Sequence, residues 1–156
     1  MDAAYVFTLC GPHPVCLWLH TDKDPPDDVW RRAMAETESA LQRAASLGGE
    51  VKALVVSDGG APTLRQRSRL TQIYDYRPYK LSVVTTVMSN PVKRGIAMAM
   101  RWFNPSLSMY QPQEMSAALA HLGLTEHWPQ IKALYRQLQD QLPLVRALDI
   151  AIHAVG

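Results

Sequence analysis

Cys10, His13 and Cys16 follow one another at intervals of three residues, and His20 comes four residues later. Thiolate and imidazole groups are the ligands that zinc prefers in proteins. A structural zinc site needs four ligands, usually in two closely spaced pairs, and the spacing here is looser. We therefore expect two buried thiols in a hairpin, with no metal site and no cofactor.

The five histidines are scattered, and none stands in the sequence beside an obvious nucleophile and an orienting acid. Nucleophilic and general acid–base catalysis need such groups within hydrogen-bond reach. Assembly of a site from distant residues stays open, but no nucleophile elbow or kinase-like motif is present. We therefore expect no catalytic residues and a protein that is not an enzyme.

Polar residues also gather where two predicted strands end. Ligands of open α/β sheets bind at the carboxyl ends of the strands, where helix N-termini present free N–H groups to an anion. The alternative is that Asp58 and Asn90 are turn and cap residues and that the glycines only permit tight turns. The candidate ligand or partner loop comprises Ser57, Asp58, Gly59, Gly60, Thr63, Ser89 and Asn90.

The formal net charge of +2 conceals one basic segment. Residues 1–60 carry a net charge of −4, residues 61–104 carry +7 and residues 105–156 carry −1. A positive surface on two helices could bind an acidic protein, an anionic membrane surface or nucleic acid, or it could simply be a solvated face. The candidate basic face comprises Arg65, Arg69, Arg77, Lys93, Arg94 and Arg101.

Nucleic acid is the weakest of these partners. The sequence pI of about 8.6 is modest, and no aromatic residues alternate with the arginines as they do on base-stacking surfaces. We therefore expect a protein partner with an acidic surface, with peripheral contact to an anionic membrane as a further option and no binding of nucleic acid.

Hydropathy and turn signals predict the elements that must position these residues. Short β-branched and aromatic runs predict strands, and apolar residues at intervals of three and four predict amphipathic helices. The predicted strands cover residues 4–10, 15–20, 51–57, 80–87 and 107–110. The predicted helices cover residues 25–48, 62–74, 90–103, 112–122 and 126–142, and a final apolar stretch reaches His153.

This order predicts an α/β fold. An N-terminal β-hairpin precedes alternating strands and helices, which is typical of a mainly parallel central sheet, here of about five strands. The length of 156 residues suits one domain, and 47% apolar residues exclude a mostly disordered chain. With no membrane-length apolar run, an acid near the N-terminus and two cysteines, we expect a cytoplasmic protein.

Several elements within residues 4–123 follow a familiar order. They are the strand 51–57 with its Asp58-Gly59-Gly60 loop, the helices 62–74 and 90–103, the strand 81–87, and the segment 109–119 with its Glu-x-x-x-Ala-Leu pattern. This order resembles the STAS-like superfamily, the fold of bacterial anti-sigma-factor antagonists and of sulfate-transporter cytoplasmic domains. The resemblance implies a divergent bacterial member and a regulatory or protein-interaction module without catalysis.

The sequence departs from that family at the phosphorylation site. Antagonist members carry an Asp-Ser-x-Gly-like phosphoacceptor at the start of the second helix, where this chain has Ala61-Pro62-Thr63. A phosphorylation switch is therefore not expected. The resemblance places a STAS-like domain at residues 1–123 and leaves residues 124–156 as a helical extension, which we expect to pack on the same domain.

Two functions from different classes remain open. The first is a non-enzymatic interaction module that uses the basic helix face. The alternative is a small-anion or lipid-binding domain with its ligand at the carboxyl ends of the parallel strands. The apolar face of the predicted helix 126–142 favours packing on its own domain, and it could instead form a homodimer.

Overall fold

The computed structural model describes residues 1–74, 81–87 and 107–156. The strands are β1 (Ala3–Cys10), β2 (His13–His20), β3 (Val51–Ser57), β4 (Leu81–Val87) and β5 (Leu107–Tyr110). The helices are α1 (Asp27–Ser46), α2 (Leu64–Tyr74), α4 (Met115–Leu122), α5 (Trp128–Gln139) and α6 (Arg146–Val155), with short 3-10 helices η1 (Pro112–Glu114) and η2 (Thr125–His127). The helix predicted over residues 90–103 lies outside the described residues.

The strands form one sheet in sequence order, β1-β2-β3-β4-β5. β1 and β2 are antiparallel and are joined by a two-residue turn, in which Gly11 adopts a φ of 59°. β2, β3, β4 and β5 run parallel to one another. The prediction of an α/β fold is therefore confirmed, and the sheet, which was predicted to be mainly parallel, is partly parallel.

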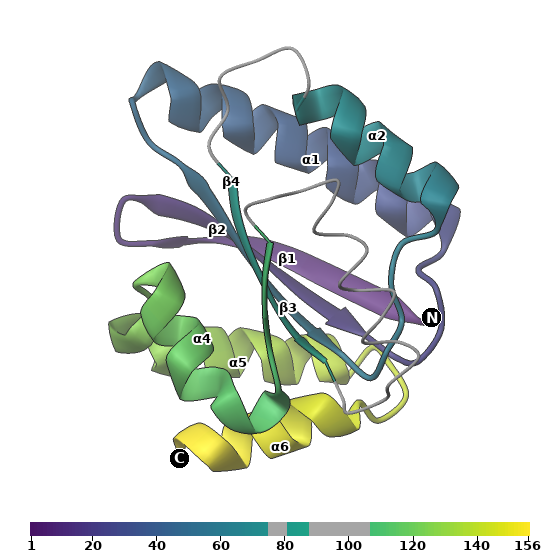
Figure 1. Ribbon diagram of the computed structural model, residues 1–156, viewed down its shortest axis with the longest axis vertical. Helices are drawn as coiled ribbons and strands as arrows, with labels where there is room; N and C mark the ends of the chain where they lie inside the picture. The colour runs from purple at the N-terminus through teal and green to yellow at the C-terminus, as the bar shows by residue number, and fades with distance from the viewer. Residues whose placement is uncertain (75–80, 88–106) are drawn as a thin grey trace.

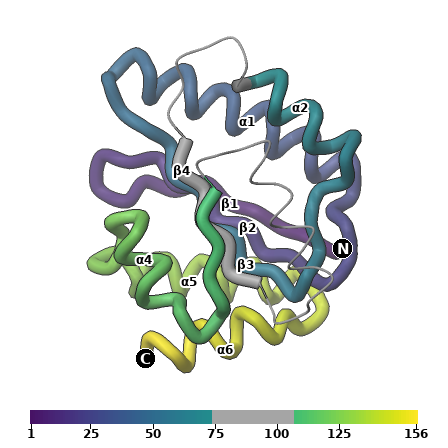
Figure 2. Tube along the Cα trace, in the orientation of Figure 1, coloured from purple at the N-terminus to yellow at the C-terminus, as the bar shows by residue number. Residues whose placement is uncertain are grey.

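Helices cover both faces of this sheet (Figure 1). α1 and α2 lie on one face, as expected when successive right-handed crossovers move along the sheet in the same direction. α4, α5 and α6 follow β5 and all lie on the opposite face (Figure 2). The result is a three-layer helix–sheet–helix arrangement.

Each face of the sheet has its own apolar core because side chains alternate along a strand. On β2, Cys16 and Trp18 join the core under α1, whereas Val15, Leu17 and Leu19 join the core under α4, α5 and α6. The buried stripe of α1 includes Trp30, Ala33, Met34, Thr37 and Leu41, which recur at helical spacing.

The C-terminal helices belong to this single fold. The apolar face of α5, with Trp128, Ile131, Tyr135 and Leu138, is buried against the sheet. The Tyr135 hydroxyl donates a 2.7 Å hydrogen bond to the backbone carbonyl of Leu54 in β3. α5 ends at Gln139, earlier than predicted, and the final apolar stretch forms a separate helix, α6.

The loops between these helices are short, and the apolar stripes of α5 and α6 are interrupted by polar positions. Within residues 1–74, 81–87 and 107–156, none of the helices combines the length and the apolar character that crossing a bilayer requires.

Candidate functional site

The predicted ligand loop lies at the carboxyl end of β3, and its polar groups are bonded to the protein itself. The Ser57 hydroxyl donates to the Gly60 carbonyl at 2.7 Å and accepts the Gly59 N–H at 2.9 Å. The Gly60 N–H donates to the Thr21 carbonyl at 2.8 Å. A Cβ at Gly60 would collide with the carbonyl oxygens of Thr21 and Lys23, so close backbone packing requires glycine there.

Asp58 caps a distant helix. Its carboxylate accepts the backbone N–H of Arg146 at 2.9 Å and that of Ala147 at 2.8 Å. These N–H groups begin α6, whose own N-cap residue, Val145, provides no side-chain acceptor. The structure thus gives Asp58 the cap role that the sequence left as the alternative to ligand binding.

Thr63 is also a cap. Its hydroxyl accepts the Gln66 N–H at 3.2 Å, and the Gln66 side-chain oxygen accepts the Thr63 N–H at 2.9 Å. This reciprocal pair is a capping box at the start of α2. The other two predicted loop residues, Ser89 and Asn90, lie outside the described residues.

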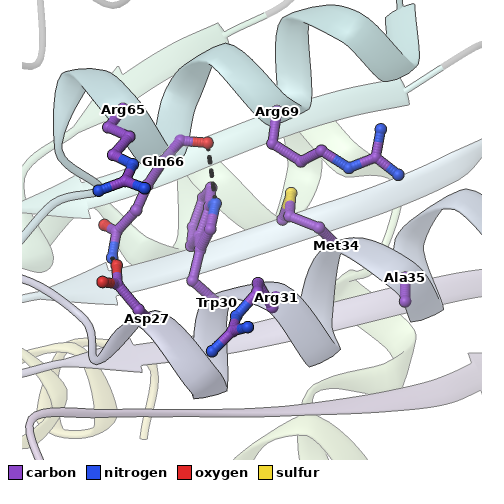
Figure 3. Close-up of a pocket in the computed structure, with 8 residues that line it drawn as sticks. All are labelled: Asp27, Trp30, Arg31, Met34, Ala35, Arg65, Gln66 and Arg69. Carbon is purple, nitrogen blue, oxygen red and sulfur yellow. Dashed lines mark hydrogen bonds between the residues drawn. The ribbon is translucent and has the colours of Figure 1, made fainter.

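The predicted basic face is described only in part. Arg65 and Arg69 are exposed and lie one turn apart on α2. Arg31 of α1, which the sequence did not single out, joins them around one groove between the helices (Figure 3). The remaining members fall in the part of the chain that the structure does not describe: Arg77, Lys93, Arg94 and Arg101.

The groove between α1 and α2 has a volume of about 460 Å³. Trp30 and Met34 form its apolar floor and are 6% and 3% exposed. Figure 3 shows Arg65 and Arg69 projecting from α2 and Arg31 from α1, with the Trp30 indole between the two helices. The remaining lining residues are Asp27, Ala35 and Gln66.

Gln66 holds the two walls together. Its side chain is buried, and its amide nitrogen donates to the Pro25 carbonyl and to the Asp27 carboxylate, both at 2.8 Å. Its backbone carbonyl accepts the Trp30 indole N–H at 2.9 Å. At the other end of the groove, the Arg69 guanidinium lies 3.1 Å from the Glu38 carboxylate. The groove is therefore fixed at both ends before anything binds.

The electrostatics of the groove are positive. Three arginines line it against one aspartate. Arg69 is paired with Glu38, whereas Arg31 and Arg65 make no ion pair with the residues that the structure describes. Exposed guanidinium groups beside an apolar floor can bind carboxylates in a bidentate manner while an apolar group covers the floor.

Local patterns in the sequence could have predicted part of the arrangement of this groove. Thr63 and Gln66 have the Thr-x-x-Gln spacing of a capping box. Asp27, Arg31 and Ala35 lie at i, i+4 and i+8 on α1, so they share one side of that helix. No local signal shows that this side of α1 faces Arg65 and Arg69, because that depends on tertiary packing.

The cysteine and histidine cluster does not form a metal site. Cys10 lies in the core under α5, whereas Cys16 lies in the core under α1. Because the two thiols are on opposite faces of the sheet, they cannot hold one ion together. Burial raises the pKa of both thiols, which disfavours the thiolate forms that bind metals.

One histidine does lie beside a hydroxyl. The Ser108 Oγ is 3.2 Å from the Nε2 atom of His121, a contact that the sequence analysis did not foresee. Both groups are at the surface, and no carboxylate in the described parts of the chain orients the imidazole. Nucleophile activation needs a base held by such a third group, so this contact is a surface hydrogen bond.

Comparison with known proteins identifies no relative. No protein-family model, no curated protein and no solved structure matches this chain.

Proposed function

We propose that this chain is a non-enzymatic interaction module that binds an acidic protein segment in the groove between α1 and α2. The observation that carries the proposal is that Arg31, Arg65 and Arg69, from two helices, line one hollow with an apolar floor. A solvated basic face needs no hollow and no fixed walls. Here the hollow is present, and its two walls are fixed because Gln66 and the Arg69–Glu38 pair join the helices.

The side chains that line the groove indicate what kind of partner it would bind. Carboxylates would pair with Arg31 and Arg65, which protrude from the two walls. An apolar side chain between those carboxylates would cover Trp30 and Met34, which supply the contact area that charged pairs lack. The proposed partner is therefore an acidic segment that carries an apolar anchor.

The sequence supports this proposal beyond the groove. The +7 segment, residues 61–104, begins at the α2 wall, and its further cations include Arg77 and Arg94. Long-range attraction by this segment would speed the encounter with an acidic partner. The STAS-like resemblance also favours a regulatory module that meets partners through its second and third helices, which are α2 and the helix predicted over residues 90–103. Membership of that superfamily is part of the proposal.

The alternative function, anion or lipid binding at the strand ends, has less support. Asp58 and Thr63 are engaged as helix caps, and Ser57 bonds within its own loop. The groove, in contrast, presents Arg31 and Arg65, which make no ion pair with the described residues. We therefore place the binding site in the groove.

Fluorescence anisotropy with a labelled peptide tests the proposal directly. The probe is a short glutamate-rich peptide with one central leucine, and a second peptide replaces each glutamate with lysine. We expect the acidic peptide alone to bind. The triple variant Arg31→Glu, Arg65→Glu and Arg69→Glu should lose that binding.

A matched control separates the groove from overall charge. Arg43→Glu, Arg136→Glu and Arg146→Glu change the net charge equally at exposed positions away from the groove. This variant should keep nearly all of the binding. Equal loss in both triple variants would show that the peptide senses only net charge, and the proposal would then be wrong. A pull-down with wild type and the groove variant can afterwards identify the natural partner.

A further inference from the structure

The first strand forms an open edge of the sheet. Among the described strands, β1 has a neighbour on one side only, namely β2. The register between them is continuous from Ala3 opposite His20 to Cys10 opposite His13, without a bulge. β1 therefore presents an unbroken edge of eight residues.

The register shows which backbone groups point outward. The Thr21 N–H donates to the Asp2 carbonyl, and antiparallel bonding alternates along the strand, so even-numbered residues bond to β2. Leu9 lies opposite Pro14, which has no N–H to donate, and this agrees with the alternation. The N–H and carbonyl groups of the odd-numbered residues, including Tyr5 and Phe7, therefore point away from the sheet.

Natural edge strands usually carry a charged side chain, a proline or a bulge that prevents pairing with another chain. The β1 sequence, Ala-Ala-Tyr-Val-Phe-Thr-Leu-Cys, contains neither a charge nor a proline. Tyr5 and Phe7 are only partly buried, and their rings pack edge to face with centroids 6.1 Å apart. The edge around Tyr5 and Phe7 is thus suited to pairing, whereas the outward carbonyl of Leu9 already accepts a hydrogen bond from the Gln130 side chain.

Charges of both signs lie beside this edge, and the Arg32 guanidinium is 3.8 Å from the Asp28 carboxylate one turn earlier on α1. Burial and the nearby Glu36 carboxylate together raise the pKa of Tyr5 to about 12, and Arg32 opposes the rise, so both charges lie near the tyrosine. Arg32 and Glu36 are one turn apart on the exposed side of α1. Opposite charges at this spacing can pair with the same two charges of a second copy placed in reverse.

The other flank of the edge is formed by α5. The Gln130 side chain of α5 donates to the Thr8 hydroxyl at 2.9 Å and to the Leu9 carbonyl at 3.0 Å, so it lies against β1. Ala133, Leu134 and Gln137 follow on the same side of α5 at helical spacing. These four side chains carry no charge, and the exposed Glu126 lies four residues before Gln130.

We infer that this edge pairs with a second copy of the chain, with the two β1 strands antiparallel about a two-fold axis. α1 runs parallel to β1, because both are antiparallel to β2. The two-fold axis therefore reverses α1 as well and places Arg32 opposite Glu36 of the partner subunit. The two sheets become one continuous sheet, and the α1–α2 grooves remain open on both subunits.

Analytical ultracentrifugation of the full chain over a wide range of concentrations tests this inference. We expect a species of 35 kDa, twice the chain mass of 17.5 kDa, to dominate at high concentration. A mass of 17.5 kDa at every concentration would overturn the inference.

Charge variants test the geometry. Glu36→Arg and Arg32→Glu each place like charges opposite one another twice in the dimer, and each should weaken dimerisation about tenfold. The double variant exchanges the two charges and should restore it. If the double variant dimerises as weakly as the single variants, the two-fold arrangement is wrong.

The α5 flank provides an independent test. Ala133→Glu introduces a negative charge on the side of α5 that lies beside the edge, so it adds one like charge to each subunit near the interface and should weaken dimerisation. Ala117→Glu, at an exposed position on α4, is the matched control and should leave it unchanged. Equal behaviour of these two variants would also overturn the inference. Circular dichroism checks that each variant is folded.

Discussion

The indole N–H of Trp30 donates a 2.9 Å hydrogen bond to the backbone carbonyl of Gln66, which is 36 residues further along the chain. This buried bond joins α1 to α2 at the floor of the groove. The Gln66 side chain reinforces it by bonding to Pro25 and Asp27 of the opposite wall. Because the walls are joined through one glutamine, the geometry of the groove and its stability depend on the same residue.

We expect Gln66→Ala to destabilise the fold and to weaken peptide binding together. The substitution removes the capping box and both side-chain bonds to the α1 wall, and leaves buried partners unsatisfied. The free energy of unfolding should fall by about 2–3 kcal/mol, measured by urea denaturation. Gln72→Ala, at an exposed position on the same helix, is the control and should change neither quantity.

The affinity for the acidic peptide should depend on salt and on the shape of the cation. Exposed ion pairs are screened at high ionic strength, so the dissociation constant measured by anisotropy should rise as salt is added. Arg65→Lys keeps the charge but loses the planar fork, and it should bind several-fold more weakly at every salt concentration. Salt-independent binding would indicate that the apolar floor alone holds the peptide.

The sequence predicted the elements of the fold better than the site. Alternation and helical periodicity are local properties, so the strand at residues 51–57 and the hairpin before it could be predicted directly. Which helix Asp58 caps could not be predicted. It depends on α6 starting 88 residues later with no cap of its own. Arg31 was missed for a similar reason, since it reaches the basic face only through the packing of α1 on α2.

Asp58→Ala should therefore affect stability and leave binding unchanged. Without the carboxylate, the N–H groups of Arg146 and Ala147 lose their acceptor, and the first turn of α6 loses its cap. We expect the free energy of unfolding to fall by about 1–2 kcal/mol, with a smaller loss for Asp58→Asn, because an amide oxygen can still accept. Unchanged peptide affinity in both variants would separate the strand-end loop from the groove.

His20 should make the stability of the protein sensitive to mild acid. It is 2% exposed at the end of β2, its ring stacks on Trp18 at 5.1 Å, and its Nδ1 atom has no hydrogen-bond partner among the described residues. Burial lowers the pKa of His20 from 6.5 to about 4, because a buried site disfavours the charged imidazolium.

The sign of the pH dependence follows from these two pKa values. Between pH 6.5 and pH 4 the unfolded chain binds a proton at His20 and the folded chain does not, so acid favours unfolding. Stability at neutral pH should be lost progressively over this range, by about 3 kcal/mol in all, and this contribution should level off below it. Urea denaturation at several pH values measures the loss. His20→Leu should flatten it, whereas His153→Gln, at an exposed position, should not. A wild-type profile no steeper than that of His20→Leu would show that the buried imidazole is protonated as readily in the folded state as in the unfolded chain.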